Sequence, residues 1–143
     1  DPEAMNVLSL IRDPLSDTFL SVAEGQLSPP SFEDACTVVK YLVPQGYPDN
    51  PQKGAAVVID GAGIESCGAS VYFASVYEEG GTIRTTSSRA FGILGKAKSL
   101  PEAEAMAEKG CACVNGQVWH RKDIGTDALV KKRMDRMKAL RGR

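Results

Sequence analysis

The sequence has little that would place it in a membrane, outside the cell or on nucleic acid. No apolar run approaches the roughly 20 residues needed to cross a bilayer. Its beginning, DPEAMNVLSL, lacks the basic and then apolar order of a signal peptide. The formal net charge over 143 residues is −1, so the molecule as a whole does not attract polyanions. We therefore expect a cytoplasmic protein with no membrane partner and no nucleic-acid partner.

The sequence is also poor in residues for common catalytic and metal sites. Its one histidine, His120, stands in no pattern typical of a Ser-His-Asp or Cys-His site. The four cysteines, Cys36, Cys67, Cys111 and Cys113, have no repeated spacing, which indicates free thiols. Zinc is not favoured, because Cys111, Cys113 and His120 lack a fourth ligand. The nucleotide-binding patterns GxxxxGK[ST] and GxGxxG are absent.

The composition indicates a folded domain, with 43% hydrophobic and 24% charged residues. The beginning of the sequence predicts two short helices. Asp1 is a candidate N-cap with Pro2 at the first helical position, and apolar residues at helical spacing extend to Ile11. Asp13 and Pro14 repeat the same cap chemistry before a second apolar stripe.

A change of pattern follows the second helix. Two prolines after Ser28 cannot carry helical hydrogen bonds, and they mark a boundary between residues 1–28 and 29–143. Beyond it, the β-branched runs TVVKYLV (37–43) and AAVVI (55–59) predict strands. The second part therefore begins as β structure.

The middle of the chain predicts a hairpin and a further strand. The segment 70–87 alternates in polarity and carries Glu79, Gly80 and Gly81 near its centre, as a turn with positive φ requires. A strand over 90–94 follows, with Gly92 and Gly95 nearby as points of close approach or bending.

Two helices are expected after the strands. Ser99 and Glu102 form a capping box, and apolar residues then continue at helical spacing to Val114. The tail 126–143 predicts a last helix with an apolar stripe and many basic residues. We therefore predict an α+β fold with short N-terminal helices, then a mostly antiparallel sheet or partial barrel with flanking helices.

The stretch TTSSRAFGILG (85–95) contains a candidate anion site. The planar fork of Arg89 can hold two oxygens of a phosphate or carboxylate, and Ser87 and Ser88 can donate to the others. The alternative is that these hydroxyls form the exposed side of a strand and that Arg89 is a solvated edge charge. Spacing alone leaves both interpretations open.

Two other segments carry charge that could bind anions. In WHRKDIG, Arg121, Lys122 and Asp123 could make a second anion contact, or Asp123 could simply pair with a neighbouring cation on the surface. The basic last helix could follow a nucleic-acid backbone, or it could be a solvated face opposite the apolar stripe.

Four motifs in order carry a family resemblance: GYPDNPQKG (46–54), the hairpin leading into TTSSRAFGILG, the helix capped at Ser99, and WHRKDIG. Together they resemble the C-terminal part of the phosphoribosylamine-glycine ligases, members of the ATP-grasp superfamily. The beginning, DPEAMNVL, resembles the end of the RFGDPE segment of that family. The resemblance runs from residue 1 to about Gly125.

The resemblance implies an activity and roles for seven residues. In the full enzyme, ATP with magnesium or manganese would activate glycine as an acyl phosphate, which the amine of 5-phosphoribosylamine attacks in purine synthesis. Residues 1–28 would end the ATP-grasp portion, and 29–143 would form the C-terminal domain. The implied substrate-binding residues are Arg89, Ser87, Ser88 and Asp1, together with Arg121, Lys122 and Asp123.

The resemblance also implies what this chain does by itself. The family's metal-binding Glu and Asn precede the segment that Asp1 matches, so we expect no ATP or metal bound to this chain and no turnover without the upstream ATP-grasp portion. A different class of function is a non-catalytic interaction module, for example one that binds RNA through the basic last helix. Binding that falls steeply with salt would indicate that module.

Overall fold

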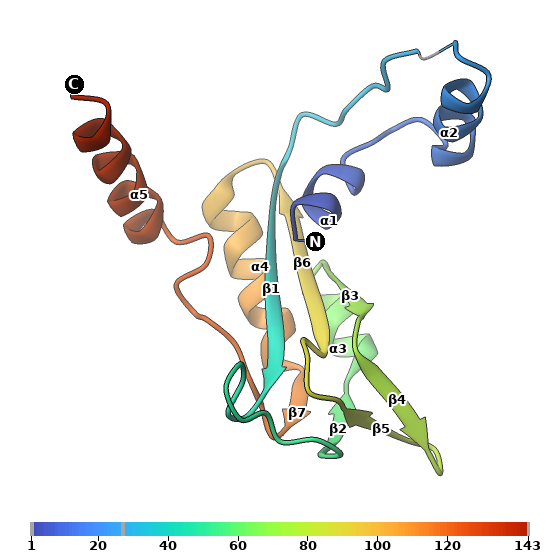
Figure 1. Ribbon diagram of the computed structural model, residues 1–143, viewed down its shortest axis with the longest axis vertical. Helices are drawn as coiled ribbons and strands as arrows, with labels where there is room; N and C mark the ends of the chain where they lie inside the picture. Colours follow the sequence, from blue (N-terminus) through green and yellow to red (C-terminus); the bar gives the residue numbers. More distant parts are fainter. Residues whose placement is uncertain (1, 27, 143) are drawn as a thin grey trace.

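The computed structural model describes residues 2–26 and 28–142 (Figure 1). Its helices are α1 (Pro2–Leu8), α2 (Leu15–Ala23), α3 (Gly61–Ser66), α4 (Leu100–Ala112) and α5 (Asp127–Leu140). Its strands are β1 (Cys36–Pro44), β2 (Ala56–Ile59), β3 (Ala69–Phe73), β4 (Val76–Glu79), β5 (Thr82–Thr85), β6 (Phe91–Ala97), β7 (Val114–Gly116) and β8 (Val118–Trp119).

The strands form two sheets of four, with the orders β3-β6-β1-β8 and β4-β5-β2-β7. The pairings within them are antiparallel. The long strands β1 and β6 lie side by side along the longest axis, and β2, β4, β5 and β7 gather at one end (Figure 1). This arrangement confirms the predicted α+β fold with its mostly antiparallel strands.

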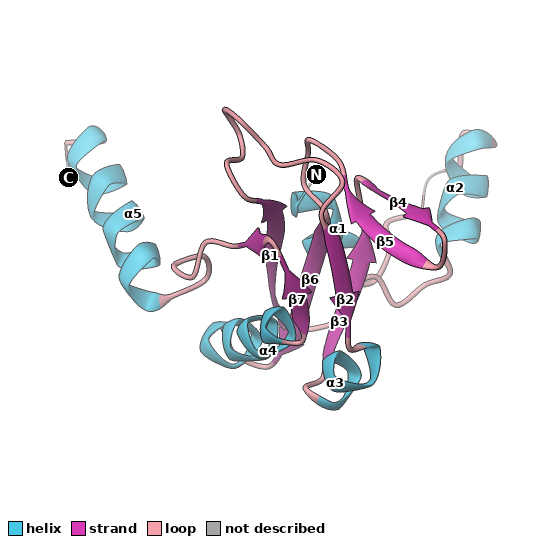
Figure 2. Cartoon of the chain, turned by 90° about the horizontal axis from the view of Figure 1, so that it is seen from below, coloured by secondary structure: helices cyan, strands magenta, loops and turns pink. Residues whose placement is uncertain are grey.

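Helices cover both faces of the sheet that contains β1 and β6. Seen from below, α3 and α4 lie on one face and α1 on the other, while α2 and α5 stand apart from the sheets (Figure 2). The main hydrophobic core lies between α4, α3 and the strands, and it includes Leu42, Ile64, Phe91, Ile93 and Cys111. On the side of α1, the sheet instead borders a cavity.

Several predicted elements are present because their local signals act within a few residues. The hairpin joins β4 to β5 through Gly80 and Gly81, whose φ angles are +59° and +77°. These positive angles favour glycine because a residue with a side chain is strained against its own backbone there. The helix α4 begins with the predicted capping box, in which the Ser99 hydroxyl accepts from the amide of Glu102 and the Glu102 carboxylate accepts from Ser99. The last predicted helix is α5.

Three local predictions at the beginning and middle of the chain are wrong. Ile11 lies outside α1 and forms an isolated antiparallel bridge with Phe32. Asp13 does not cap α2, because Pro14 takes the N-cap position and the Asp13 carboxylate accepts hydrogen bonds from Ser31 instead. The segment that contains the hairpin also includes β3, which belongs to the other sheet beside β6.

A fourth correction concerns the end of α4. Its helical spacing predicts Val114 on that helix, but α4 ends at Ala112 and Val114 begins β7, where it pairs with Ile59 of β2. Tertiary pairing with β2 overrides the helical spacing here. The short elements α3, β7 and β8 were not predicted as separate elements.

The described residues also bear on the predictions about thiols and membranes. All four cysteines lie within the described ranges and are free thiols, as the sequence predicts. Within the same ranges, no helix combines the length and the apolar character that crossing a bilayer requires.

Gly95 sets the distance between α4 and β6. A Cβ on Gly95 would lie 2.8 Å from the amide nitrogen of Ala107, and backbone atoms cannot move aside as a flexible side chain can. We predict that Gly95→Ala lowers the free energy of unfolding by about 1–3 kcal/mol through overpacking. Urea denaturation measures this change. Gly61→Ala is the matched control, because nothing lies within 4 Å of its Cβ. Equal stability of the two variants would contradict the prediction.

Candidate functional site: a cavity beside the first helix

A cavity of about 690 Å³ opens between α1, β1 and the beginning of α5. Residues of α1 line one part of it, and alternate residues of β1, including Val39, Tyr41 and Val43, line another. Arg89 enters it from the turn between β5 and β6, and Trp119 and Arg121 enter it from the end of β8 and the segment that follows. Segments distant in sequence therefore meet at one concave surface.

The main chain around Arg89 is held by hydrogen bonds on two sides. The carbonyl of Arg89 accepts from the amide of Ser75 at 2.9 Å, and the carbonyl of Ala90 accepts from Ala74 at 2.9 Å. On the other side, the amide of Ala90 donates to the carbonyl of Leu42 in β1 at 2.9 Å. The β5–β6 turn thus fixes the point from which the Arg89 side chain starts.

The guanidinium of Arg89 lies over an aromatic ring of the same cavity. Its central carbon is 5.0 Å from the centroid of the Tyr41 ring, within the range of a cation–π interaction. Burial raises the pKa of the Tyr41 phenol, and the nearby charge of Arg89 opposes this rise. The sequence motif did not reveal Tyr41, although the alternation along β1 places it on the face opposite Lys40.

The hydroxyl groups before Arg89 differ in burial and in their hydrogen-bond partners. Thr85 is fully buried and donates to the carbonyl of Gln52 at 3.1 Å, which attaches the 46–54 segment to β5. The Thr86 hydroxyl lies 2.9 Å from the carbonyl of Ser75 and accepts from the amide of Ser88 at 3.3 Å. Ser87 is exposed and Ser88 is half-buried, and of this turn it is Arg89 that lines the cavity.

The second predicted anion segment is divided in the structure. Arg121 lines the cavity and makes two bonds to Asp123, from Nε to Oδ1 at 3.0 Å and from the guanidinium to Oδ2 at 2.7 Å. This pairing lowers the pKa of Asp123. Lys122 contributes its backbone carbonyl to a buried contact rather than its side chain to the cavity lining. The pairing of Asp123 agrees with the alternative of a surface ion pair.

Asp1 lies outside the described residues, but its neighbours in α1 are at the cavity. Glu3 and Asn6 line it, and so do Val130 and Arg133 of α5. Sequence reasoning missed these four residues, because their approach depends on how α1 and α5 are placed against β1.

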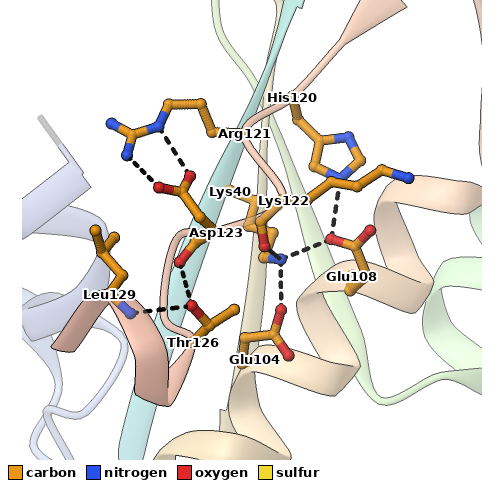
Figure 3. Close-up of polar contacts among 9 residues, drawn as sticks. All are labelled: Lys40, Glu104, Glu108, His120, Arg121, Lys122, Asp123, Thr126 and Leu129. Atoms are coloured by element: carbon orange, nitrogen blue, oxygen red, sulfur yellow. Dashed lines mark hydrogen bonds and ion pairs between the residues drawn. The ribbon is translucent and has the colours of Figure 1, made fainter. Parts of the chain in front are cut away.

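A buried charge cluster lies behind the segment that carries Arg121 (Figure 3). The side chain of Lys40 is 0% exposed, and its ammonium donates to Glu104 at 2.6 Å, to Glu108 at 2.6 Å and to the carbonyl of Lys122 at 3.0 Å. His120 contacts the same oxygen of Glu108 at 2.9 Å. Burial would lower the pKa of Lys40, but the two carboxylates raise it above its ordinary value.

With this geometry established, a comparison with protein families identifies the domain. A family model described as the C domain of phosphoribosylglycinamide synthetase matches residues 37–127. The chain belongs to this family. The matched range includes most of the cavity lining and the whole Lys40 cluster, whereas α1 and almost all of α5 lie outside it.

Curated relatives of the synthetase family extend the likeness over nearly the whole chain. A phosphoribosylamine–glycine ligase of Methanobrevibacter smithii is 45% identical over 140 residues, which is 98% of this chain and 32% of the relative. The ligase of Methanosarcina barkeri is 46% identical over 144 residues, 99% of this chain and 32% of that protein. This chain therefore spans about a third of the length of the relatives that it matches.

A solved structure shows the same fold. The crystal structure of phosphoribosylamine–glycine ligase from Thermotoga maritima aligns with a TM-score of 0.72 at 25% identity. The alignment covers 86% of this chain and 30% of that one. The likeness in sequence and the likeness in fold therefore both extend over most of this chain.

The acidic and sulfur-containing side chains do not form a cation site in the described part of the chain. Within residues 2–26 and 28–142, no group of three or more His, Cys, Asp or Glu side chains is arranged to hold a metal ion. Glu104 and Glu108 instead pair with Lys40. The magnesium or manganese that the family resemblance implies has no set of ligands among these residues, and we assign it none there.

The charge cluster gives a testable pH dependence. Burial would raise the pKa of Glu108, but hydrogen bonds from Lys40 and His120 lower it below the ordinary 4.5. A lowered folded-state pKa stabilises the fold above pH 4.5, and this contribution is lost as the pH falls through the lowered value. We predict that Glu108→Gln destabilises by about 1–3 kcal/mol at pH 7, since charged hydrogen bonds are weakened.

Urea denaturation from pH 7 to pH 3 measures this dependence. The difference in unfolding free energy between the unmodified chain and Glu108→Gln should shrink below pH 4.5. Glu33→Gln is the control, because Glu33 pairs with Lys96 at the surface, where such a pair contributes about 1 kcal/mol or less. A difference for Glu108→Gln that stays constant over this pH range would contradict the prediction.

Proposed function

We propose that this chain forms the sugar-phosphate side of the substrate site of a cytoplasmic phosphoribosylamine–glycine ligase. That enzyme would join 5-phosphoribosylamine and glycine at the expense of ATP in purine synthesis. In this proposal, residues 1–28 end the ATP-grasp portion, residues 29–143 form the C-terminal domain, and the rest of the site comes from the upstream ATP-grasp portion. The family membership and the cavity beside α1 support it.

The observation that carries the proposal is the placement of Arg89. Its carbonyl is tied to the β3–β4 connection and the amide of the next residue is tied to β1. Its guanidinium lies over Tyr41, and its side chain lines a cavity of about 690 Å³. A phosphate ester offers several oxygens to a planar guanidinium, which can donate two parallel hydrogen bonds. We assign Arg89 to the phosphate of 5-phosphoribosylamine.

The other assigned residues act around this contact. Ser87 and Ser88 stand in the turn that carries Arg89, and we propose that their hydroxyls or amides donate to the remaining phosphate oxygens. Asp1 is assigned to the ribose or its amine from the family resemblance. Arg121, Lys122 and Asp123 remain proposed contacts, of which Arg121 has support from its place in the cavity lining.

The chemical contribution of these residues is placement rather than proton transfer. ATP with its metal ion would supply the activated glycine in the full enzyme, and the ligands of that metal are not assigned to this chain. A phosphate held by Arg89 fixes the ribose, and thereby the direction from which its amine approaches the activated carboxyl group. Holding two reactants in such a geometry can contribute several kcal/mol to lowering a barrier.

The interaction-module alternative gains no support from the comparisons. The relatives from Methanobrevibacter smithii and Methanosarcina barkeri are named as ligases, and the likeness to them extends over nearly the whole chain. The basic residues of α5 are exposed, and so are the apolar residues Met134, Met137 and Leu140 of the same helix.

Replacing Arg89 tests the proposed function in a full-length ligase whose C domain has this sequence. We predict that Arg89→Ala raises KM for 5-phosphoribosylamine about ten- to a hundredfold, because a charged hydrogen bond contributes about 1.5–3 kcal/mol. KM for ATP should stay nearly unchanged, because the lost contact is with the sugar phosphate. Steady-state kinetics with each substrate varied in turn measure both constants.

A matched variant separates this contact from the general loss of a positive charge. Arg136→Ala removes a guanidinium from an exposed position of α5 that does not line the cavity, so it should leave both Michaelis constants unchanged. An equal rise of KM for 5-phosphoribosylamine and of KM for ATP in Arg89→Ala would contradict the assignment of Arg89. An unchanged KM for 5-phosphoribosylamine would contradict it as well.

A further inference from the structure

The buried charge of Lys40 is not explained by packing. On the same face of β1, two residues away on either side, Val38 and Leu42 are apolar and buried. An apolar residue of similar volume usually stabilises a core as well as a buried ion pair does, because desolvation offsets the attraction between the charges. An apolar residue at this position, however, could not donate a hydrogen bond to the carbonyl of Lys122.

The three donors of the Lys40 ammonium are all used. Two go to carboxylates on successive turns of α4, at Glu104 and Glu108, and the third goes to the carbonyl of Lys122. The carboxylates hold the ammonium charged and oriented, and the third bond attaches a different segment of the chain. Figure 3 shows Lys40 between α4 and the segment that carries Arg121, Lys122 and Asp123.

The segment 119–126 needs such an attachment. The strand β8 pairs with β1 at the positions Val43↔Trp119 and Pro44↔Val118, so the ladder to β1 extends no further than Trp119 among the described pairings. After Trp119, the segment contacts β1 through Lys122 and again through Gly125. Gly125 has a φ of +83°, and a Cβ there would lie 2.8 Å from a methyl carbon of Val38.

The attached segment forms one wall of the cavity. Arg121 and Gly125 line the cavity directly. Thr126 then caps α5 by accepting from the amide of Leu129, and Val130 and Arg133 of that helix line the same cavity. A shift of Lys122 would therefore move both the loop part and the helical part of this wall.

We propose that Lys40 is a positioning residue for substrate binding. Through the carbonyl of Lys122 it holds the wall formed by the segment 119–126 and the beginning of α5, in the cavity that Arg89 also lines. The ligand class is the sugar phosphate assigned to Arg89, so this inference rests on the proposed function. Lys40 itself touches no substrate, because its side chain is fully buried.

Backbone order parameters test the attachment in the 143-residue chain. In the unmodified protein, the amides of residues 121–126 should have order parameters of about 0.85, as in rigid backbone, and values below about 0.6 would overturn the proposal. This measurement requires no variant to fold. In the Lys40→Met variant, the order parameters of residues 121–126 should be lower than those of β6 in that variant.

Glu104→Gln is the matched control for an effect on stability alone. It weakens the contact between Lys40 and α4 and leaves the contact with Lys122 in place. We expect it to lower the unfolding temperature without a selective loss of order over 121–126. Selective loss of order in Glu104→Gln as large as in Lys40→Met would overturn the role assigned to Lys40.

Kinetics of the full-length ligase complete the test. Lys40→Met should raise KM for 5-phosphoribosylamine on the order of tenfold, because a misplaced wall weakens positioning, with little change in KM for ATP. Arg89→Ala is measured in parallel. A raised KM in Arg89→Ala with an unchanged KM in Lys40→Met would overturn this inference and leave the proposed function standing. An unchanged KM in Arg89→Ala would refute the proposed function itself.

Discussion

The pleat of β1 is the constraint on which the rest of the structure depends. Because successive side chains of a strand point to opposite faces, Lys40 faces α4 and Tyr41 faces the cavity. A slip of one residue in the register of β1 against β6 would exchange these two faces. The pairing of Leu42 with Phe91, and of Val39 with Leu94, fixes that register along the whole strand. Core and site are thus specified together.

The fold could be predicted where short-range signals decide it. The glycine pair of the β4–β5 turn and the capping box at Ser99 each act through bonds within a few residues, and both are present as predicted. Predictions failed where distant partners decide the structure. Val114 has a helical spacing, but pairing with Ile59 places it in a strand. Asp13 has cap chemistry, but it binds Ser31, which lies beyond α2 in the chain.

The candidate site could be predicted only in part, for the same reason. Arg89 and Arg121 stand in sequence motifs that indicate anion binding, and both line the cavity. Tyr41 and Arg133 carry no motif. Tyr41 reaches the cavity through the pairing of β1, and Arg133 through the course of the chain from β8 to α5, and neither is visible in the sequence. Lys40 was concealed within the apolar run TVVKYLV, because the sequence does not show that two carboxylates from α4 meet its ammonium.

The hydrogen bonds around Arg89 have a consequence for how a ligand would be distinguished from its analogues. Because hydrogen bonds with Ser75 and Leu42 hold the main chain on both sides, the side chain of Arg89 begins at a fixed point. No loop has to become ordered at this point when a ligand arrives, so little conformational entropy is lost there. Discrimination would then depend on reach, since an ester whose oxygens lie beyond the span of the Arg89 side chain from this fixed main chain cannot meet its guanidinium.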